Sequence, residues 1–396
     1  MFPTDVVIVA GARTPMARYT GVFSEVSAID LGAHAAKGAV QRSGVDPGEF
    51  DHVVFGNVLQ TSSDAIYGAR HVGLKAGLRV ETPAVTVNRL CGSGIEAIAQ
   101  AAQLLLLGES SMVLAGGMEN MTQAPFVIRG ARTGLKLGGG VLEDFLMVGL
   151  TDSYCRLPMA LTAEKLAAQT GITRQDADAY ALRSQQAADA AAKACVFKEE
   201  IVPLEVKQGR KSIVVTEDDH RRPETTMETL EKLPPSFQKD GIVTAGNASG
   251  IVDGAAAVVV TRERTAKERG LKPIGRIIAW AAVGVDPSIM GIGPVPATRK
   301  ALKLAGLKLE QIDRVEVNEA FAAQYLAVEK ELGLPREKTN VNGGAIALGH
   351  PLAASGTRLV ITVLNELRRK GLKYGLATAC IGGGQGIAMI VEALGN

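Results

Sequence analysis

The sequence predicts an α/β protein built from two similar layered halves, with a large insertion in the first half. Apolar strands alternate with helical stretches in both the N-terminal and the C-terminal parts, which is typical of sheets covered by helices. The chain has 396 residues, more than one hydrophobic core usually serves. A strand that runs into a glycine turn occurs at 112–120 and again at 377–386, which indicates an internal repeat.

The elements of the first half follow from short apolar runs and turn residues. Each strand is expected to be covered on both faces, because its residues are continuously apolar. A β-rich run at 85–88 leads into a cysteine turn, and a long apolar helix follows. Strands are expected at 6–10, 53–59 and 112–115, and helices at 29–43 and 65–76.

The segment from 121 to 244 differs from the rest of the chain in composition and periodicity, and it is interpreted as an insertion. It is glycine-rich at first, then helical at 161–169 and 175–195, then charged and proline-containing. Thr173 and Asp176 form a plausible capping pair for the longer helix. Long segments between domain elements usually form lids or binding loops. Alternation resumes at 250–263, which is interpreted as a helix start and a strand.

These patterns predict three parts. The N-terminal half comprises 1–121 and 245–270, the loop domain comprises 122–244, and the C-terminal half comprises 271–396.

Composition excludes several classes of function. The net charge is +2 and only 4% of residues are aromatic, so no nucleic-acid partner is expected. The longest uninterrupted apolar run, at 277–285, is half of what a membrane span needs, so no membrane partner is expected. No leader precedes the first strand, which favours the cytoplasm, or the mitochondrial matrix for a eukaryotic source.

The four cysteines indicate free thiols. None belongs to a CxxC pair, which argues against a disulfide framework and against a zinc site. We expect a reducing compartment and no metal. The cysteines are Cys91, Cys155, Cys195 and Cys380.

Cys91 is the first candidate nucleophile. It lies in a turn between a strand and a helix, where backbone N–H groups are unpaired and the helix dipole is positive. We therefore expect its pKa to be lowered. Gly92 and Gly94 permit a sharp turn and the close approach of a substrate. The alternative is that Cys91 is an ordinary core residue.

Three further stretches place reactive groups at the exits of strands, where α/β folds bind their ligands. Asn318 and Glu319 end one strand, Cys380 ends another, and His350 stands between Gly349 and proline. Each has a structural alternative: a helix cap for Asn318, a core position for Cys380, and a loop position for His350. The glycines after Cys380 lack the Lys-Ser/Thr of a phosphate loop, so nucleotide binding is disfavoured.

Taken together, five stretches resemble the thiolase family, in the family's order and across the whole chain. They are NRLCGSG (88–94), GNASGIVDGAAA (246–257), NEAFA (318–322), NGGAIALGHP (342–351) and CIGGGQG (380–386). The stretches at 56–74 and 286–297 are most similar to the degradative 3-ketoacyl-CoA branch of the family. The resemblance implies a five-layered α-β-α-β-α sandwich of two βαβαβαββ halves with a loop domain, assembled as a homodimer or homotetramer.

The resemblance also implies a chemistry, the thiolytic cleavage of 3-oxoacyl-CoA by coenzyme A in fatty acid β-oxidation. Cys91 would attack the substrate and carry the acyl group, and Cys380 would move the proton in both half-reactions. His350 would polarise the thioester oxygen and help to ionise Cys91. Asn318 would hold a water in one oxyanion hole, while the N–H groups of Cys91 and Gly382 would form the other. No permanently bound cofactor is implied.

For the substrates, coenzyme A, acetyl-CoA and 3-oxoacyl-CoA, the family pattern carries over to five positions. Arg222 would stack on adenine, and Ser249 would bond the pantetheine amide. Phe237, Met290 and Phe321 would line the pantetheine and acyl path. The alternative for Met290 is ordinary packing.

The chain departs from the family at two points. Ala353 stands where thiolases usually have glycine after the His-Pro-x sequence, and its methyl group would act on the His350 loop. Leu157-Pro158-Met159 replaces the His-Met pair of biosynthetic acetoacetyl-CoA thiolases, which favours the degradative enzyme.

Three alternatives remain at the level of sequence. One is a short-chain acetoacetyl-CoA thiolase working in the synthetic direction. Another is a protein that binds acyl-CoA without turnover, which the presence of all the reactive residues disfavours. The third is a decarboxylating ketosynthase, which would need a second active-site histidine. The other histidines, His34, His52, His71 and His220, lie in stretches without a reactive setting.

Overall fold

A mixed β-sheet of ten strands organises the computed structural model, which describes residues 5–395. The strand order is β14-β15-β16-β13-β1-β12-β5-β3-β4, and β2 pairs with β12. The sheet strands are β1 (Val6–Arg13), β2 (Ala17–Arg18), β3 (His52–Gly56), β4 (Ala84–Val87), β5 (Met112–Glu119), β12 (Val252–Arg262), β13 (Gly275–Gly284), β14 (Arg314–Val317), β15 (Tyr374–Ile381) and β16 (Gln385–Ala393).

The two halves are joined within this sheet. Strand β3 is parallel to β4 and β5, and β14 is parallel to β15, whereas the other neighbours are antiparallel. A short pairing of β1 with β13, Val7 with Arg276 and Ile8 with Gly275, connects the N-terminal strands to the C-terminal strands. The halves predicted from the sequence are therefore also continuous through backbone hydrogen bonds.

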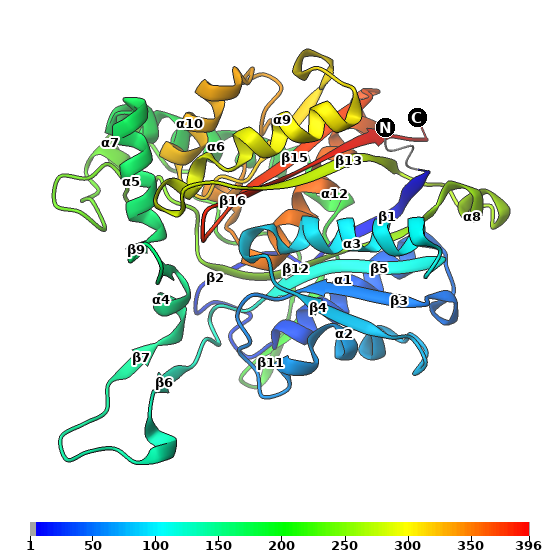
Figure 1. Ribbon diagram of the computed structural model, residues 1–396, viewed down its shortest axis with the longest axis horizontal. Coiled ribbons are helices and arrows are strands. Elements are labelled where there is room, and N and C mark those ends of the chain that lie inside the picture. Colours follow the sequence, from blue (N-terminus) through cyan, green and yellow to red (C-terminus); the bar gives the residue numbers. More distant parts are fainter. Residues whose placement is uncertain (1–4, 396) are drawn as a thin grey trace.

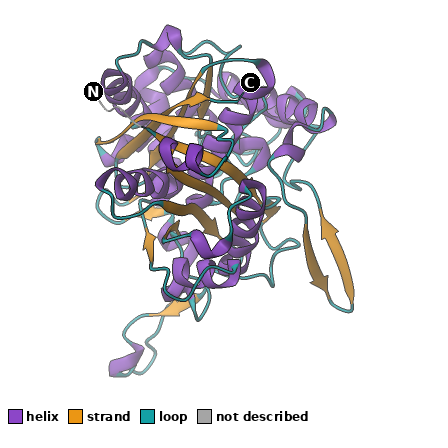
Figure 2. Ribbon diagram, turned by 90° about the vertical axis from the view of Figure 1, so that its right-hand side faces the viewer, coloured by secondary structure: helices purple, strands orange, loops and turns teal. Residues whose placement is uncertain are grey.

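Helices cover both faces of the strands and fill the space between the two halves, which confirms the predicted five-layered sandwich (Figures 1 and 2). Three apolar cores separate the layers, because each helix layer buries its apolar side chains against strands. The outer layers are α1 (Ala28–Ser43) with α2 (Gly68–Ala76), and α9 (Pro294–Ala305) with α10 (Ala322–Leu332); the central layer is α3 (Ser93–Leu107) with α12 (Leu352–Lys370).

Helix α3 is apolar enough to qualify by composition as a membrane span. The segment Leu90–Leu107 has a mean hydropathy of 1.4, and just over half of it is buried in the protein. Our sequence criterion, an uninterrupted apolar run, missed it because Glu96 and Gln100 interrupt the segment. Its place in the central layer explains the composition, since a helix enclosed by two sheets needs apolar residues on most sides.

The insertion forms several small elements and two longer helices. The capping pair is confirmed, because Thr173 and Asp176 form a capping box at the start of α6. The segment around β6 and β7 extends away from the body of the molecule (Figure 1). The elements are β6 (Phe126–Ile128), β7 (Leu142–Asp144), α4 (Phe145–Gly149), β8 (Thr151–Asp152), β9 (Leu157–Pro158), α5 (Met159–Thr170), α6 (Arg174–Lys193), β10 (Leu204–Gln208), β11 (Lys211–Val215) and α7 (Met227–Glu231).

One element was predicted wrongly. The stretch at 250–263 does not begin with a helix, because β12 begins at Val252 and continues to Arg262. The next helix is α8 (Glu263–Glu268), and α11 (Ala345–Leu348) is the remaining short helix.

Helices α3 and α12 meet backbone to backbone. A Cβ atom at Gly94 would lie 2.4 Å from the Thr357 nitrogen, and one at Gly356 would lie 2.5 Å from the Ile95 nitrogen. Only glycine permits such an approach. It brings the starts of the two helices together between the two half-sheets, and the candidate site lies there.

Candidate active site

Cys91 lies in a 3₁₀ turn, Leu90–Gly92, immediately before α3. The Ser93 hydroxyl fixes this turn, because it donates a hydrogen bond to the Leu90 carbonyl (2.7 Å) and accepts one from the Arg89 N–H (2.9 Å). Leu90 has a φ of 47°, so the backbone reverses directly before the cysteine. Cys91 is a free thiol that remains partly exposed.

His350 lies between α11 and α12 and is buried. Its Nδ1 lies 2.5 Å from the Ser355 Oγ, and that hydroxyl donates to the Pro351 carbonyl at 3.1 Å. The hydroxyl therefore accepts a hydrogen bond from Nδ1–H, which leaves the lone pair of the neutral ring on Nε2. The Asn318 amide nitrogen lies 3.3 Å from Nε2 and matches this tautomer as a donor. The contact with Ser355 was not anticipated from the sequence.

Asn318 follows strand β14 and is fully buried. Its N–H donates to the Thr378 carbonyl at 2.9 Å, which ties it to β15. Its Oδ1 has no hydrogen-bond partner among the described residues. A buried amide oxygen of this kind is suited to bind a polar group that enters the site.

Cys380 completes the group from the end of β15 and is fully buried. Burial raises its pKa above the ordinary thiol value, and the nearby Cys91 sulfur raises this pKa further. The Gly382 N–H donates to the Cys91 sulfur. The structure thus brings together Cys91, Cys380 and Gly382, and Cys91 and His350 line one cavity.

The electrostatics of the site differ from our sequence expectation. We expected a lowered pKa for Cys91, but burial raises it to about 11. The N–H groups of Gly382 and Cys91 do lower the pKa of the thiol, as expected, but desolvation raises this pKa by more. Burial, assisted by the Arg358 charge, lowers the pKa of His350 to about 3. Thiol and imidazole are therefore both neutral at rest.

The cavity beside Cys91 has a volume of about 170 Å³ and is mostly apolar. Four of the predicted substrate-binding residues line it: Ser249, Phe237, Met290 and Phe321. Met290 also packs against Cys380, which agrees with its structural alternative as well. Sequence reasoning missed the contribution of Met147 and Leu150 from the insertion, although the apolar run at 145–150 was a signal for it. The other lining residues are Met121, Met147, Leu150, Pro158, Met159, Ala160, Ala248, Gly250, Ile251, Ala320 and Leu352.

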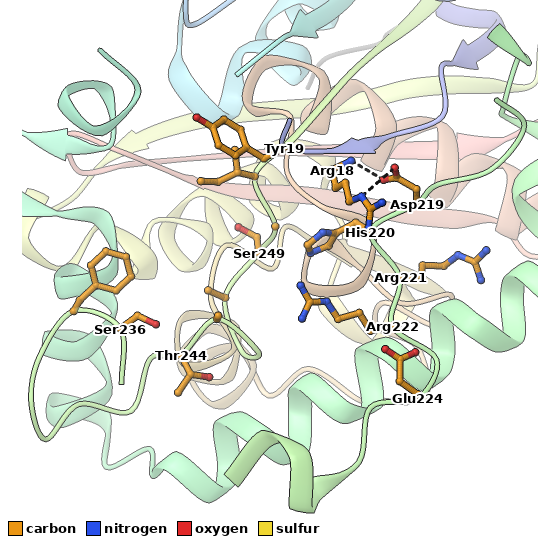
Figure 3. A pocket seen from close by; sticks show the side chains of 15 residues that line it. Arg18, Tyr19, Asp219, His220, Arg221, Arg222, Glu224, Ser236, Thr244 and Ser249 are labelled. Atoms are coloured by element: carbon orange, nitrogen blue, oxygen red, sulfur yellow. Dashed lines mark hydrogen bonds and ion pairs between the residues drawn. The ribbon is translucent and has the colours of Figure 1, made fainter. Parts of the chain in front are cut away.

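An outer cavity of about 660 Å³ opens towards solvent and shares Phe237 and 248–251 with the inner cavity, so the two cavities adjoin. Arg222 extends into the outer cavity, whereas Arg221 points away (Figure 3) and pairs with Glu217 at 2.9 Å. His220 also lines this outer cavity, beside Arg222, in a stretch already predicted to bind coenzyme A. It does not line the inner cavity with Cys91 and His350.

Ala353, the residue that departs from the family pattern, is fully buried. Its methyl group lies beside Gly56, where an added Cβ atom would come within 3.3 Å of it and within 2.7 Å of the Ser93 Cβ. The absence of a side chain at position 56 therefore leaves room next to the Ala353 methyl group.

Comparisons with known proteins agree with this geometry. The thiolase N-terminal domain matches residues 6–264 and the thiolase C-terminal domain matches residues 271–393. The human mitochondrial 3-ketoacyl-CoA thiolase is 54% identical over 98% of both chains. An acetyl-CoA acetyltransferase of Pseudomonas aeruginosa is 49% identical over 97% of this chain and 98% of the relative. The crystal structure of the human enzyme in complex with CoA superimposes with a TM-score of 0.96, at 54% identity and 98% coverage of both chains.

The fold and the matches along nearly the whole chain define an acyltransferase of the two-domain thiolase type. The chain belongs to the thiolase family.

Ser355→Ala tests the tautomer of His350. Loss of the hydroxyl frees Nδ1, so the ring should spend less time with its lone pair on Nε2, and kcat should fall by about 10-fold or more. Steady-state kinetics with acetoacetyl-CoA would measure it. The KM for CoA should stay within about twofold, since Ser355 does not line the outer cavity. Ser355→Thr retains a hydroxyl and should restore most of the rate. An unchanged kcat in Ser355→Ala would contradict the assignment.

Proposed function

We propose that this thiolase is a 3-ketoacyl-CoA thiolase, which cleaves 3-oxoacyl-CoA with coenzyme A to give acetyl-CoA and an acyl-CoA shortened by two carbons. The observation that carries the proposal is the outer cavity, with Arg222 in it, adjoining the apolar cavity that both Cys91 and His350 line. An extended thioester substrate fits such an arrangement. The 54% identity to the human enzyme supports the same substrate class.

In the first half-reaction, the Cys91 sulfur attacks the C3 carbonyl while the Nε2 lone pair of His350 takes the thiol proton. The C2–C3 bond then breaks, the acyl group stays on Cys91, and Cys380 gives its proton to C2 of the departing acetyl-CoA enolate. The raised pKa of Cys380 matches this role, because a buried thiol retains its proton until a strong base forms beside it.

In the second half-reaction, the Cys380 thiolate takes the proton of the coenzyme A thiol, and the new thiolate attacks the acyl carbon on Cys91. The N–H groups of Cys91 and Gly382 stabilise the tetrahedral oxyanion. The C–S bond to Cys91 breaks, and protonated His350 returns the proton to the Cys91 sulfur. Both half-reactions balance with no further reactant.

Substrate binding is assigned to the loop domain, 122–244, and the adjacent GNASG stretch. Arg222 is positioned to stack on the adenine, since it reaches into the outer cavity (Figure 3). Ser249 lines both cavities and is suited to bond the pantetheine amide. The remaining parts, 1–121 with 245–270 and 271–396, then act as the two catalytic halves, their terminal residues 1–4 and 396 lying outside the described structure.

We also propose that the protein works as a homodimer or homotetramer. Strand β4 lies at an edge of the sheet and bonds only β3 within the described chain, and Val80 and Val85 beside it are exposed. Unpaired apolar edges of this kind favour association. The extended segment carries further exposed apolar side chains, among them Phe126 and Leu137, which support a second contact.

The cellular setting follows from the chemistry. Two reactive thiols need a reducing compartment, and all four cysteines are free in the structure. We place the enzyme in the cytoplasm of a bacterial source or the mitochondrial matrix of a eukaryotic one, in β-oxidation.

A short-chain acetoacetyl-CoA thiolase is the second candidate. The similarity to acetyl-CoA acetyltransferases and the modest inner volume of about 170 Å³ favour it. Pro158 and Met159 line the inner cavity where the biosynthetic enzymes have a polar His-Met pair, which favours the broader degradative specificity.

The covalent step predicts an acylated Cys91. Brief incubation with acetoacetyl-CoA, followed by acid quench and peptide mass spectrometry, should find one acetyl group on Cys91 and none on Cys155 or Cys195. Cys91→Ala should reduce cleavage by at least about 10⁴-fold, because the covalent route is lost. Normal cleavage by Cys91→Ala would overturn the mechanism.

Chain length separates the two candidate functions. For a 3-ketoacyl-CoA thiolase, kcat/KM should stay within about 10-fold from C4 to medium-chain 3-oxoacyl-CoA, because added methylenes enter an apolar cavity. Activity confined to acetoacetyl-CoA would instead select the short-chain enzyme. Steady-state assays over a series of 3-oxoacyl-CoA substrates make the measurement.

A further inference from the structure

Glu119 is a buried carboxylate that the mechanism above does not use. It is the last residue of β5 and is fully buried. Within residues 5–395 no lysine or arginine forms an ion pair with it. Burial raises its pKa to about 7, and the nearby Asp253 on β12 raises this pKa as well. Burying a carboxylate that has no ion-pair partner costs free energy, so we expect Glu119 to have a role that offsets this cost.

Four hydrogen bonds converge on this carboxylate from two separate loops. Oε1 accepts from the Leu59 N–H at 2.9 Å and from the Asn57 amide at 3.1 Å. Oε2 accepts from the Val58 N–H at 3.2 Å and from the Ala353 N–H at 3.1 Å. The carboxylate therefore holds segment 57–59 and the start of α12 at a fixed separation.

On the α12 side, Glu119 acts as a cap supplied by a distant strand. The N-cap residue Pro351 has no side-chain hydrogen bond to the helix, so Glu119 satisfies an N–H that would otherwise be unpaired. A carboxylate at a helix N-terminus is also stabilised by the helix dipole. His350 immediately precedes this cap.

On the other side, segment 57–59 leads to the nucleophile. The Asn88 amide nitrogen donates to the Val58 carbonyl at 3.3 Å, and the Asn88 Oδ1 accepts from the Leu90 N–H at 2.9 Å. Leu90 is the residue before Cys91. A chain of hydrogen bonds thus runs from Glu119 to the turn that carries the nucleophile.

We propose that Glu119 is a positioning residue for the thiolase reaction, whose carboxylate sets the Cys91 turn and the His350 loop relative to each other. Attack on the substrate needs the thiol and the imidazole at the correct distance and orientation. A misplacement near 1 Å can lower the reaction rate substantially. The inference rests on the proposed function, but its consequence for the reactivity of Cys91 does not.

Glu119→Gln is the direct test, because the amide keeps the size of the side chain and loses the charge and part of the accepting capacity. We expect kcat to fall by about 10-fold or more, with the KM for CoA within about twofold. We also expect iodoacetamide to alkylate Cys91 faster at neutral pH, because the Glu119 charge contributes to the raised pKa of this thiol. A pH profile of alkylation that shifts to lower pH, with an unchanged rate at high pH, separates this charge effect from a loosened turn, which would raise the rate at every pH.

Asp253→Asn is the matched control. Asp253 is also buried, but it accepts hydrogen bonds from the N–H and the hydroxyl of Thr122 and none from segment 57–59 or from α12. Its substitution should lower the thermal unfolding temperature while kcat stays near wild type. Because loss of the Asp253 charge favours the ionised form of Glu119, Cys91 should not be alkylated faster in this variant. Glu119→Asp keeps the charge on a shorter side chain and provides a second variant if Glu119→Gln does not fold; its kcat should fall without faster alkylation.

The proposal is overturned if Glu119→Gln, or the shorter variant in its place, loses thermal stability alone and retains wild-type kcat. Lack of thiolase activity in the wild type would contradict the proposed function instead. In that case the alkylation rate of Cys91 still tests the coupling to Glu119, since it requires no turnover.

Discussion

The structure depends on the backbone contact between α3 and α12. Gly94 and Gly356 allow the two helices to approach until backbone nitrogen atoms occupy the places of side chains. Gly117 allows the same on the sheet side, since a Cβ atom there would lie 2.0 Å from the Ala353 carbonyl oxygen. Because Cys91 precedes one helix and His350 precedes the other, this packing places the proposed nucleophile and the proposed base at one cavity. Larger residues at these glycine positions would push the two helices apart, and Cys91 and His350 would then move apart as well.

Burial then determines the protonation of the site. The free enzyme holds neutral thiols and a neutral imidazole, because a charged form would be poorly solvated there. The proposed mechanism therefore requires ionisation to accompany the attack on a bound substrate that accepts the developing charge. This arrangement explains why the site contains preformed donors, such as the Gly382 N–H and the Asn318 amide, since such groups act most strongly where water is excluded.

Much of the fold could be predicted from the sequence, because its signals are local. Continuous apolar runs marked the buried strands, and the capping pair before α6 marked a helix start. The start of the 250–263 stretch was misread, because Gly250 precedes the strand and Gly254 interrupts its apolar run. The apolar character of the whole of α3 was likewise missed, because single polar residues interrupt its apolar run.

The reactive residues were recognisable, but their energetics were not. The motif at Cys91 indicated a helix N-terminus, and the sign of its pKa shift was still wrong, because desolvation depends on how much protein surrounds the thiol. Ser355 and Glu119 escaped notice because each acts through a contact that only folding creates: Ser355 on His350, and Glu119 on segments 57–59 and 352–353.

The central claim is that the sulfurs of Cys91 and Cys380 face one shared acyl group. Arsenous acid tests it most directly, because one trivalent arsenic atom bonds two thiols only when they lie close together. The account predicts that native mass spectrometry and peptide mapping find a single arsenic bridge between Cys91 and Cys380, and that prior acetylation of Cys91 prevents it. Absence of a bridge while both thiols still react separately with a small alkylating reagent would contradict the account.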